Sequence, residues 1–181
     1  GIGAFETMAL EDGVPVFFDR HMERLEGAAK YFGIPFQREP VERMVWDYLD
    51  RNKEKLSGHD ALNSAVSEKN FVVSVHPNPY AGKDSDTMVR TEYSQIRRNE
   101  TSPLTYYKTL NYAENLMEKR KAAQQGFDEA VFLNGKGEIT EGTVSNVFFV
   151  KDGKLYTPPV SCGMLPGIMR EYVCRSFQAE E

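Results

Sequence analysis

Residues 113–140, which read AENLMEKRKAAQQGFDEAVFLNGKGEIT, decide the fold class of this chain. Their first half predicts a helix over residues 113–125, closed by Gly126, because glycine commonly follows the last turn of a helix. Two short segments, 130–133 and 138–140, then flank Asn134-Gly135-Lys136-Gly137, which predicts a tight β-hairpin. A helix that leads directly into an antiparallel hairpin indicates a mixed α+β fold.

The rest of the chain contains the same two kinds of element. Asp-Gly pairs at 12–13 and 152–153 are strong turn signals between apolar runs, and apolar residues three or four positions apart mark helices. We therefore expect hairpins over residues 4–18 and 147–156, strands at 71–75 and 88–96, and helices at 22–32, at 40–49 and after Gly167. The fold class is α+β, a mixed α/β arrangement.

A polar, proline-ended stretch at residues 99–103 has the composition of a linker. We expect a small N-terminal α/β domain over residues 1–98, an interdomain linker at 99–103 and a large domain over 104–181. The chain starts without an initiator Met and stops soon after an apolar periodic run. We therefore expect a chain truncated at both ends.

Composition excludes several classes of protein. The chain has 181 residues, 40% of them hydrophobic and 27% charged, which is typical of a globular rather than a disordered protein. No apolar run approaches the roughly 20 residues of a membrane helix, and a net charge of −5 without a basic cluster argues against nucleic-acid binding. The two cysteines, Cys162 and Cys174, have no metal-site or disulfide spacing, which favours a reducing, cytoplasmic location. The three histidines are scattered, so no metal site is expected.

The opening hexapeptide, Gly1 to Glu6, has part of the glycine spacing of a dinucleotide-binding loop. Glu6 occupies the place of the third glycine, and a strand rather than a helix follows. Glycines of this kind more often permit close backbone approach within a sheet. We therefore do not assign nucleotide binding to this segment.

Lys108 is the first candidate for chemistry. It follows Tyr106-Tyr107 and precedes Thr109-Leu110-Asn111-Tyr112, so it stands among aromatic and apolar residues at the entry to a helix. Burial lowers the pKa of a lysine because desolvation penalises the ammonium form, and the neutral amine is the nucleophile that Schiff-base chemistry needs. The alternative is an exposed lysine whose aliphatic stem covers apolar surface, and local context alone favours that alternative.

Three further features have complementary chemistry. Glu141 ends a predicted strand, where its carboxylate either faces a cationic ring nitrogen or is a solvated turn residue. Arg24, inside a predicted helix, is either a phosphate ligand or an exposed charge. The helix that opens within residues 165–169 offers backbone N–H groups to an anion. A lysine, a carboxylate, an arginine and a helix N-terminus together are the components of a pyridoxal phosphate site.

The order and spacing of these motifs resemble the class IV aminotransferases, the fold-type IV pyridoxal phosphate enzymes. That family includes branched-chain aminotransferases, D-amino acid aminotransferases and 4-amino-4-deoxychorismate lyases. The resemblance covers nearly the whole chain and is weakest over residues 50–100. The segments that carry it are GAFET (3–7), HMERL (21–25), KTLNY (108–112), DEA (128–130), EGTVSN (141–146), TPP (157–159) and LPGIMR (165–170).

The resemblance implies pyridoxal 5′-phosphate as the cofactor, a homodimer, and small-molecule substrates. It also implies that residues 104–181 form the large, cofactor-binding domain and that this domain is incomplete at its C-terminus. By the same resemblance Lys108 is the Schiff-base lysine and the catalytic acid and base, and Glu141 is the partner of the pyridine nitrogen. It further implies phosphate contacts from the Arg24 side chain and from the backbone N–H groups of Ile168 and Met169, a position for Tyr112 near the phenolic oxygen of the cofactor, and a place for Phe5 in the substrate pocket.

Three functions remain open at this point. The first is amino transfer between an amino acid and a 2-oxo acid. The second is aminodeoxychorismate lyase activity, which releases pyruvate and 4-aminobenzoate, and Met169 favours it slightly because many transaminases have Thr at that position. The third is a non-catalytic homologue or an incomplete fragment. Arg97 and Arg98 are candidates for the substrate carboxylate by charge alone, and a solvated linker is the favoured interpretation of that pair.

Overall fold

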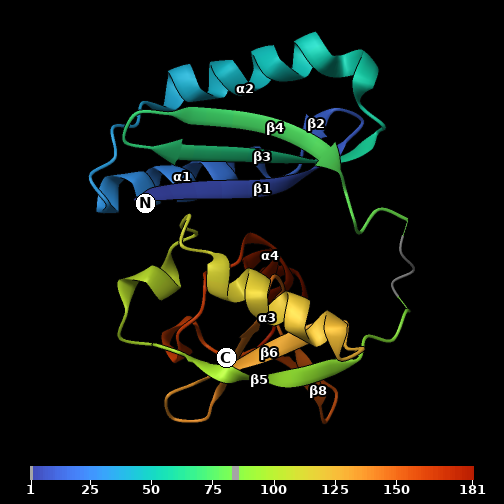
Figure 1. Cartoon of the computed structure of the whole chain (residues 1–181). Coiled ribbons are helices and arrows are strands. Elements are labelled where there is room, and N and C mark those ends of the chain that lie inside the picture. Colours follow the sequence, from blue (N-terminus) through green and yellow to red (C-terminus); the bar gives the residue numbers. More distant parts are fainter. Residues whose placement is uncertain (1, 83–85) are drawn as a thin grey trace. The chain divides into compact units, whose positions relative to one another are not determined.

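The computed structural model describes residues 2–82 and 86–181, so Gly1 and residues 83–85 of the expected N-terminal domain lie outside the described residues. The chain forms two compact units (Figure 1). The first comprises Gly1–Thr87 and Lys108–Asn111, and the second comprises Met88–Tyr107 and Tyr112–Glu181. Both units mix helices with strands, so the expected α+β class is confirmed.

The first unit is built on an antiparallel sheet with the strand order β2-β1-β3-β4 (Figure 1). Helix α1 contacts β1, helix α2 contacts β4, and the two helices contact each other, so they cover one face of the sheet. The elements are β1 (Gly3–Glu11), β2 (Val14–Pro15), α1 (Phe18–Tyr31), α2 (Arg38–Asn52), the 3₁₀ helix η1 (Lys53–Lys55), β3 (His59–Ser67) and β4 (Phe71–Pro77).

Alternation along β1 explains why this strand anchors the unit. Its even-numbered side chains are buried towards the helices, whereas Thr7 and Glu11 on the other face are exposed. The turn after β1 uses Asp12 and Gly13, both with positive φ, as the Asp-Gly signal predicts. The apolar core beneath the helices consists of Met8, Leu10, Met22, Leu25, Val45, Leu49, Leu62 and Val66.

The short segment Lys108–Asn111 runs beside β1 in the first unit. The Phe5 N–H donates to the Lys108 carbonyl and the Leu110 N–H donates to the Gly3 carbonyl, both at 2.9 Å. A Cβ built on Gly3 would lie within 3 Å of the Leu110 side chain and of the Val66 carbonyl. Gly3 therefore permits close approach of two segments, which confirms the structural interpretation of the N-terminal glycine.

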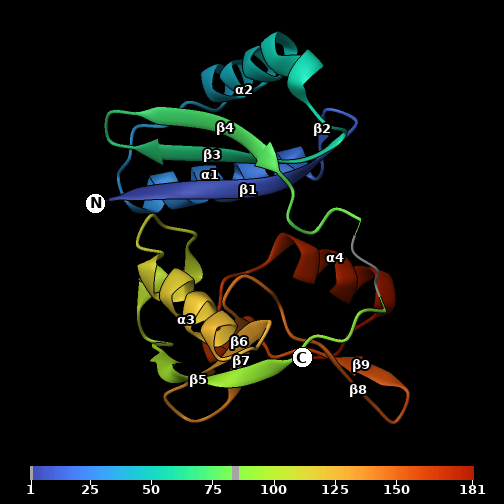
Figure 2. The ribbon, with the colours of Figure 1, turned by 45° about the vertical axis from the view of Figure 1, so that its right-hand side comes forward.

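The second unit contains a three-stranded sheet with the order β5-β6-β7 and a separate two-stranded hairpin of β8 and β9 (Figure 2). Strands β5 and β6 are parallel, and helix α3 contacts both of them. The elements are β5 (Thr91–Arg98), η2 (Pro103–Tyr106), α3 (Ala113–Gln124), β6 (Glu129–Asn134), β7 (Ile139–Gly142), β8 (Phe149–Lys151), β9 (Lys154–Tyr156), η3 (Val160–Cys162) and α4 (Ile168–Phe177). The helix and hairpin expected over residues 113–140 are therefore confirmed.

The division of the chain differs from the one expected at residues 99–103. Strand β5 was assigned to the N-terminal domain, but it pairs with β6 and belongs to the second unit. The polar stretch 99–103 lies within that unit, and Lys108 belongs to the first. The cause is a pairing between strands separated in sequence, which no local pattern of residues encodes.

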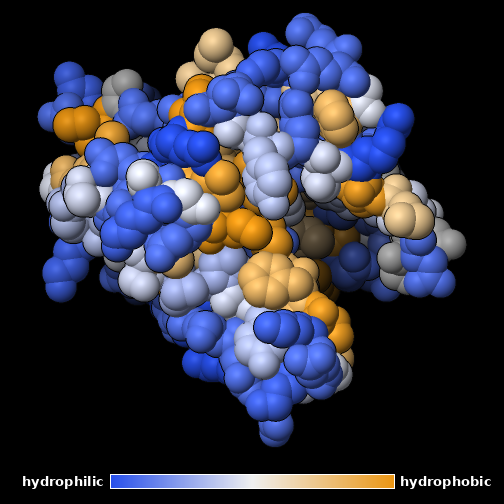
Figure 3. Space-filling model, turned by 90° about the horizontal axis from the view of Figure 1, so that it is seen from below, coloured by the Kyte–Doolittle hydropathy of each residue, from blue (hydrophilic) through white to orange (hydrophobic). Residues whose placement is uncertain are grey.

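Large apolar side chains remain exposed on the helices of the second unit. Met117, Met169 and Phe177 each expose more than half of their surface. On the face drawn in Figure 3, hydrophobic side chains interrupt a mostly hydrophilic surface. Within residues 2–82 and 86–181, no helix has both the length and the apolar character needed to cross a bilayer.

Candidate active site

Lys108 lies against an aromatic ring in the first unit. Its Nζ is 4.3 Å from the centroid of the Phe5 ring, and the two backbones are hydrogen-bonded to each other. Lys108 itself is half-buried and its neighbour Thr109 is buried. The structure therefore brings together two of the residues that the motifs single out, the candidate lysine and the candidate pocket residue Phe5.

Arg24 lies on α1 and contacts a carboxylate that is fully buried. Its Nε and Nη2 groups donate to the two carboxylate oxygens of Glu6 at 2.6 and 2.7 Å, and His21 Nδ1 lies 2.7 Å from Glu6 Oε2. Burial alone would raise the pKa of Glu6, but the hydrogen bonds from Arg24 and His21 outweigh it and lower the pKa below its usual value of 4.5. Arg24 is thus not an exposed charge, and neither Glu6 nor His21 had been predicted as its partner.

Glu141 lies at the end of β7 in the second unit, with a side chain that is only 10% exposed. Arg98 Nη2 lies 3.2 Å from its carboxylate, and the backbone N–H of Leu165 donates to it at 3.3 Å. Arg98 is itself buried, stacks 3.9 Å above the ring of Phe132 and lies 3.3 Å from Glu114. The solvated-linker interpretation is therefore wrong for Arg98, whereas Arg97 is exposed.

Tyr112 precedes α3 and is tied to the turn that follows Glu141. Its hydroxyl donates to the Thr143 carbonyl at 3.0 Å, and Asn115 Nδ2 donates to the same oxygen at 2.7 Å. Burial, reinforced by the negative charge of Glu141, raises the pKa of Tyr112 to about 12. The phenol therefore keeps its proton at every physiological pH.

The Glu129 carboxylate stabilises the turn over residues 142–145. Thr143 and Ser145 both donate their hydroxyls to this carboxylate, and the Gly142 N–H donates to the Ser145 carbonyl at 2.8 Å. A Cβ on Gly142 would overlap the Ser145 hydroxyl and crowd the Glu129 side chain, so a larger residue there would force these side chains to move. These contacts fix the segment that begins with Glu141. The motif EGTVSN thus encodes a rigid turn as well as a carboxylate.

Ile168 and Met169 form the start of α4, directly after the N-cap residue Gly167. The first N–H groups of a helix have no acceptor within the helix, and the helix dipole favours an anion near them. Ile168 is buried, whereas the Met169 side chain is exposed. Leu165, whose N–H contacts Glu141, lies three residues before the helix. The hydrogen bond from Leu165 therefore connects Glu141 to the loop that leads into α4.

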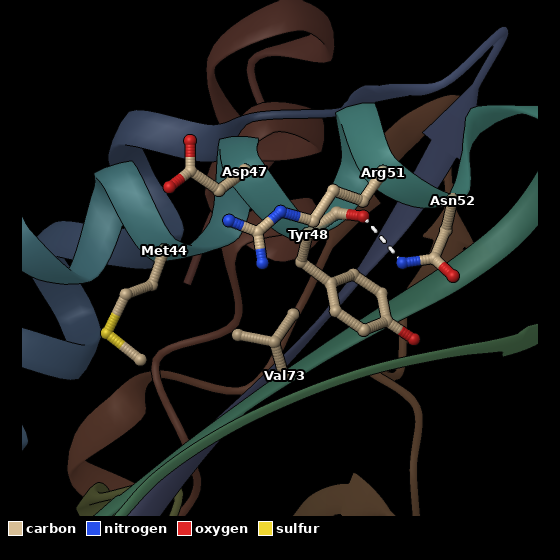
Figure 4. Close-up of a pocket in the computed structure, with 6 residues that line it drawn as sticks. All are labelled: Met44, Asp47, Tyr48, Arg51, Asn52 and Val73. Carbon is tan, nitrogen blue, oxygen red and sulfur yellow. Dashed lines mark hydrogen bonds between the residues drawn. The ribbon is translucent and has the colours of Figure 1, made fainter.

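A surface groove of about 500 Å³ lies elsewhere, between α2 and β4 in the first unit (Figure 4). Its lining combines opposite charges with apolar groups, and one side is fixed by a 2.8 Å hydrogen bond from Asn52 Nδ2 to the Tyr48 carbonyl. The lining residues are Met44, Asp47, Tyr48, Arg51, Asn52 and Val73. None of them belongs to the motifs that carry candidate chemistry.

Comparison with known proteins identifies relatives along the whole chain. The family pattern "Amino-transferase class IV" matches residues 3–181. The aminodeoxychorismate lyase of Bacillus subtilis (strain 168) is 30% identical over 96% of this chain and 64% of its own length. The branched-chain-amino-acid aminotransferase of Escherichia coli (strain K12) is 27% identical over 97% of this chain and 63% of its own length.

Solved structures agree with these relatives. The branched-chain aminotransferase of the archaeon Thermoproteus uzoniensis, determined with norvaline, superposes with a TM-score of 0.83 at 26% identity, over 97% of this chain and 65% of that one. The chain thus spans slightly less than two thirds of each of these three proteins. The fold matches the fold-type IV structures. With a family pattern that covers residues 3–181, the chain belongs to the class IV aminotransferase family, whose members typically use pyridoxal phosphate.

Proposed function

We propose that this chain is a pyridoxal phosphate-dependent amino acid aminotransferase with Lys108 as its catalytic lysine. The observation that carries the proposal is the setting of Lys108. Backbone hydrogen bonds at the Lys108 carbonyl and at the Leu110 N–H fix the segment against β1, and the Lys108 amine lies against the face of Phe5. A lysine fixed in this way has a defined position for its amine, which a flexible surface lysine lacks.

The residues present fit the chemistry of the cofactor. A buried carboxylate at Glu141 suits a protonated pyridine nitrogen, and the α4 start at Ile168 and Met169 suits a phosphate. Arg24 supplies a cation for the phosphate, and Tyr112, with a pKa of about 12, supplies a neutral phenol.

When bound, pyridoxal phosphate supplies an aldehyde that condenses with amines and a ring that accepts an electron pair. Side chains of the protein would transfer the protons and orient the substrate and the cofactor. Lys108 Nζ would take the proton from the substrate α-carbon, and in the reverse half-reaction it would deliver a proton to that carbon. Glu141, whose carboxylate pairs with Arg98, would stabilise a proton on the ring nitrogen. The Phe5 ring excludes water from one side of the Lys108 amine.

Lyase activity on aminodeoxychorismate is the second candidate. The same proton abstraction precedes loss of pyruvate, and the residue at the start of α4 is Met169, as in some lyases of the family, rather than the Thr of many transaminases. The Bacillus subtilis relative carries that name. The homodimer and the cytoplasmic location remain predictions.

The first test is an absorbance spectrum of the purified chain with added pyridoxal phosphate. We expect a visible band that borohydride removes, present in the wild type and absent in Lys108→Ala. Lys69→Ala is the matched control, because Lys69 is an exposed lysine of the same unit. A colourless wild type, or a Lys108→Ala variant that keeps the band, contradicts the proposal.

The second test separates the two activities. Amino transfer requires a 2-oxo acid acceptor, whereas the lyase forms pyruvate and 4-aminobenzoate without one. We expect product only when an amino acid and a 2-oxo acid are both present. Formation of 4-aminobenzoate from aminodeoxychorismate alone would replace the aminotransferase proposal with the lyase.

A further inference from the structure

The cluster of Glu6, His21 and Arg24 has a geometry that fold stability alone does not explain. Glu6 is 0% exposed, and its side chain lies in the middle of β1 on the face covered by α1. It accepts two hydrogen bonds from one guanidinium, and an imidazole nitrogen lies within hydrogen-bond distance of the same carboxylate. An apolar residue at this position of the strand, like its neighbours Met8 and Leu10, would continue the hydrophobic core.

Burying these charges carries a cost that their attraction only partly offsets. Ion pairs in protein interiors are often no more stabilising than well-packed apolar residues of similar volume. What such a pair does provide is orientation, because the planar guanidinium fork meets a carboxylate in one geometry. Arg24 has four flexible side-chain bonds, and the two contacts to Glu6 fix the direction in which its guanidinium faces.

The sequence spacing supports an orienting role. His21 and Arg24 are three residues apart on α1, so both side chains project from the same face of the helix towards β1. Glu6 uses the Nε–H and one Nη2–H of Arg24, which leaves three of the five guanidinium N–H groups outside the contact with Glu6. The contact therefore directs one edge of the guanidinium towards β1 and the other edge away from it.

We propose that Glu6 and His21 are positioning residues that hold Arg24 in the orientation that binds the phosphate of the cofactor. The inference rests on the proposed function, since Arg24 acts there as a phosphate ligand. Glu6 makes no contact with the phosphate itself. The Glu6 carboxylate cancels much of the positive charge of Arg24. The contact therefore orients the guanidinium and does not add positive charge near the phosphate.

The test compares the binding of two forms of the cofactor, pyridoxal phosphate and pyridoxal, which lacks the phosphate. Dissociation constants are measured by absorbance or fluorescence titration, without any turnover. We expect Glu6→Gln to weaken pyridoxal phosphate binding about tenfold and to leave pyridoxal binding within twofold of the wild type. Arg24→Gln is expected to show the same selectivity with a larger loss.

The matched control is Glu11→Gln. Glu11 lies on the same strand and its carboxylate is 2.8 Å from His59 Nδ1, but both side chains are more than half exposed and no arginine joins them. We expect this variant to bind both forms as the wild type does. Glu11→Gln thus reproduces the loss of a strand carboxylate beside a histidine and leaves the Arg24 cluster intact.

Two histidine variants serve if Glu6→Gln folds poorly. His21→Leu removes the nitrogen beside Glu6 and is expected to weaken pyridoxal phosphate binding severalfold, whereas His21→Asn keeps a donor there and is expected to restore it. An equal loss for both cofactor forms in Glu6→Gln and His21→Leu would show a merely structural role and overturn the inference, as would unchanged binding in both variants. If the wild type retains pyridoxal phosphate at Lys108 in either case, the proposed function stands. If the wild type binds neither form, the proposed function and the inference both fail.

Discussion

Each unit of this chain contains a buried glutamate beside an arginine, and the two pairs differ in geometry. In the first unit Glu6 meets Arg24 at 2.6 and 2.7 Å through both carboxylate oxygens, and His21 adds a third contact at 2.7 Å. In the second unit Glu141 lies 3.2 Å from Arg98 and 3.3 Å from the Leu165 N–H. The first carboxylate is tightly bound, and the second has longer contacts.

The two geometries separate a carboxylate that fixes a neighbouring side chain, Glu6, from one that is suited to meet a ligand directly, Glu141. Glu6 stands in the middle of a strand under a helix, where three short contacts satisfy it. Glu141 stands at the end of a strand beside a glycine turn and the loop that opens α4. Strand ends and helix starts are where binding groups are commonly presented. The pair in the first unit is therefore expected to affect stability and, through Arg24, cofactor binding, whereas the pair in the second unit is expected to affect turnover.

Removal of the Glu6 carboxylate should have the largest effect on stability. In Glu6→Ala, Arg24 loses its buried partner, and we expect the free energy of unfolding to fall by about 3–5 kcal/mol. Denaturant unfolding followed by circular dichroism measures the change. The exposed Glu11→Ala variant should cost about 1 kcal/mol or less. An equal fall in the free energy of unfolding for the two variants would show that the buried contacts of Glu6 stabilise the fold no more than the exposed contact of Glu11 does.

Glu141→Gln should lower the turnover number strongly and the free energy of unfolding only a little. A neutral amide cannot stabilise a proton on the ring nitrogen as an anion does, so we expect kcat to fall by about 10²–10³-fold. Arg98 keeps Glu114 and the Phe132 ring as neighbours, so the stability loss should be smaller than in Glu6→Ala. The measurement pairs steady-state kinetics with unfolding curves. Unchanged kcat with a large loss of stability would show that the Glu141–Arg98 pair is structural and takes no part in turnover.

The pH dependence of stability gives a further test of the Glu6 contacts. The pKa of Glu6 is lowered in the folded chain, so its contribution to stability is fully present above its unfolded-state pKa, near 4.5, and is lost as the pH falls through the lower folded-state value. We expect the unfolding free energy of the wild type to decrease below about pH 4.5 more steeply than that of Glu6→Gln. Parallel curves for the two proteins would contradict this assignment.

Tyr112→Phe should have the smallest effect. The variant loses one hydrogen bond to the Thr143 carbonyl, which Asn115 still satisfies, so we expect a loss of about 0.5–1.5 kcal/mol. In the wild type, ultraviolet titration should show one tyrosine that ionises near pH 12, and this component should be missing from the variant. A Tyr112 that ionises near pH 10 would show that the phenol is not buried.

Local signals predicted the turns and helices of this fold well. Asp12-Gly13 and Gly135-Lys136-Gly137 form the observed turns, and Gly126 follows the end of α3 as expected. Strand β3 was missed because residues 51–69 appear polar. Its buried positions include Asp60 and Ser64, so the alternation is not apolar.

The partners in the two buried ion pairs could not be predicted from the sequence, for a different reason. Glu6 and Arg24 are 18 residues apart, and Arg98 and Glu141 are further apart still. The motifs identified Arg24 and Glu141 as candidates because their residue types match the chemistry. Their partners Glu6, His21 and Arg98 follow only from strand pairing and helix packing, which local patterns do not specify.

The central claim is that Lys108 is the amine that bonds to pyridoxal phosphate. The most direct test incubates the chain with the cofactor, reduces the mixture with borohydride, digests it and locates the modified lysine by mass spectrometry. We predict that the cofactor is attached to Lys108, with no comparable modification at the exposed control Lys69. Attachment at other lysines with Lys108 unmodified, or no attachment at all, would contradict the account.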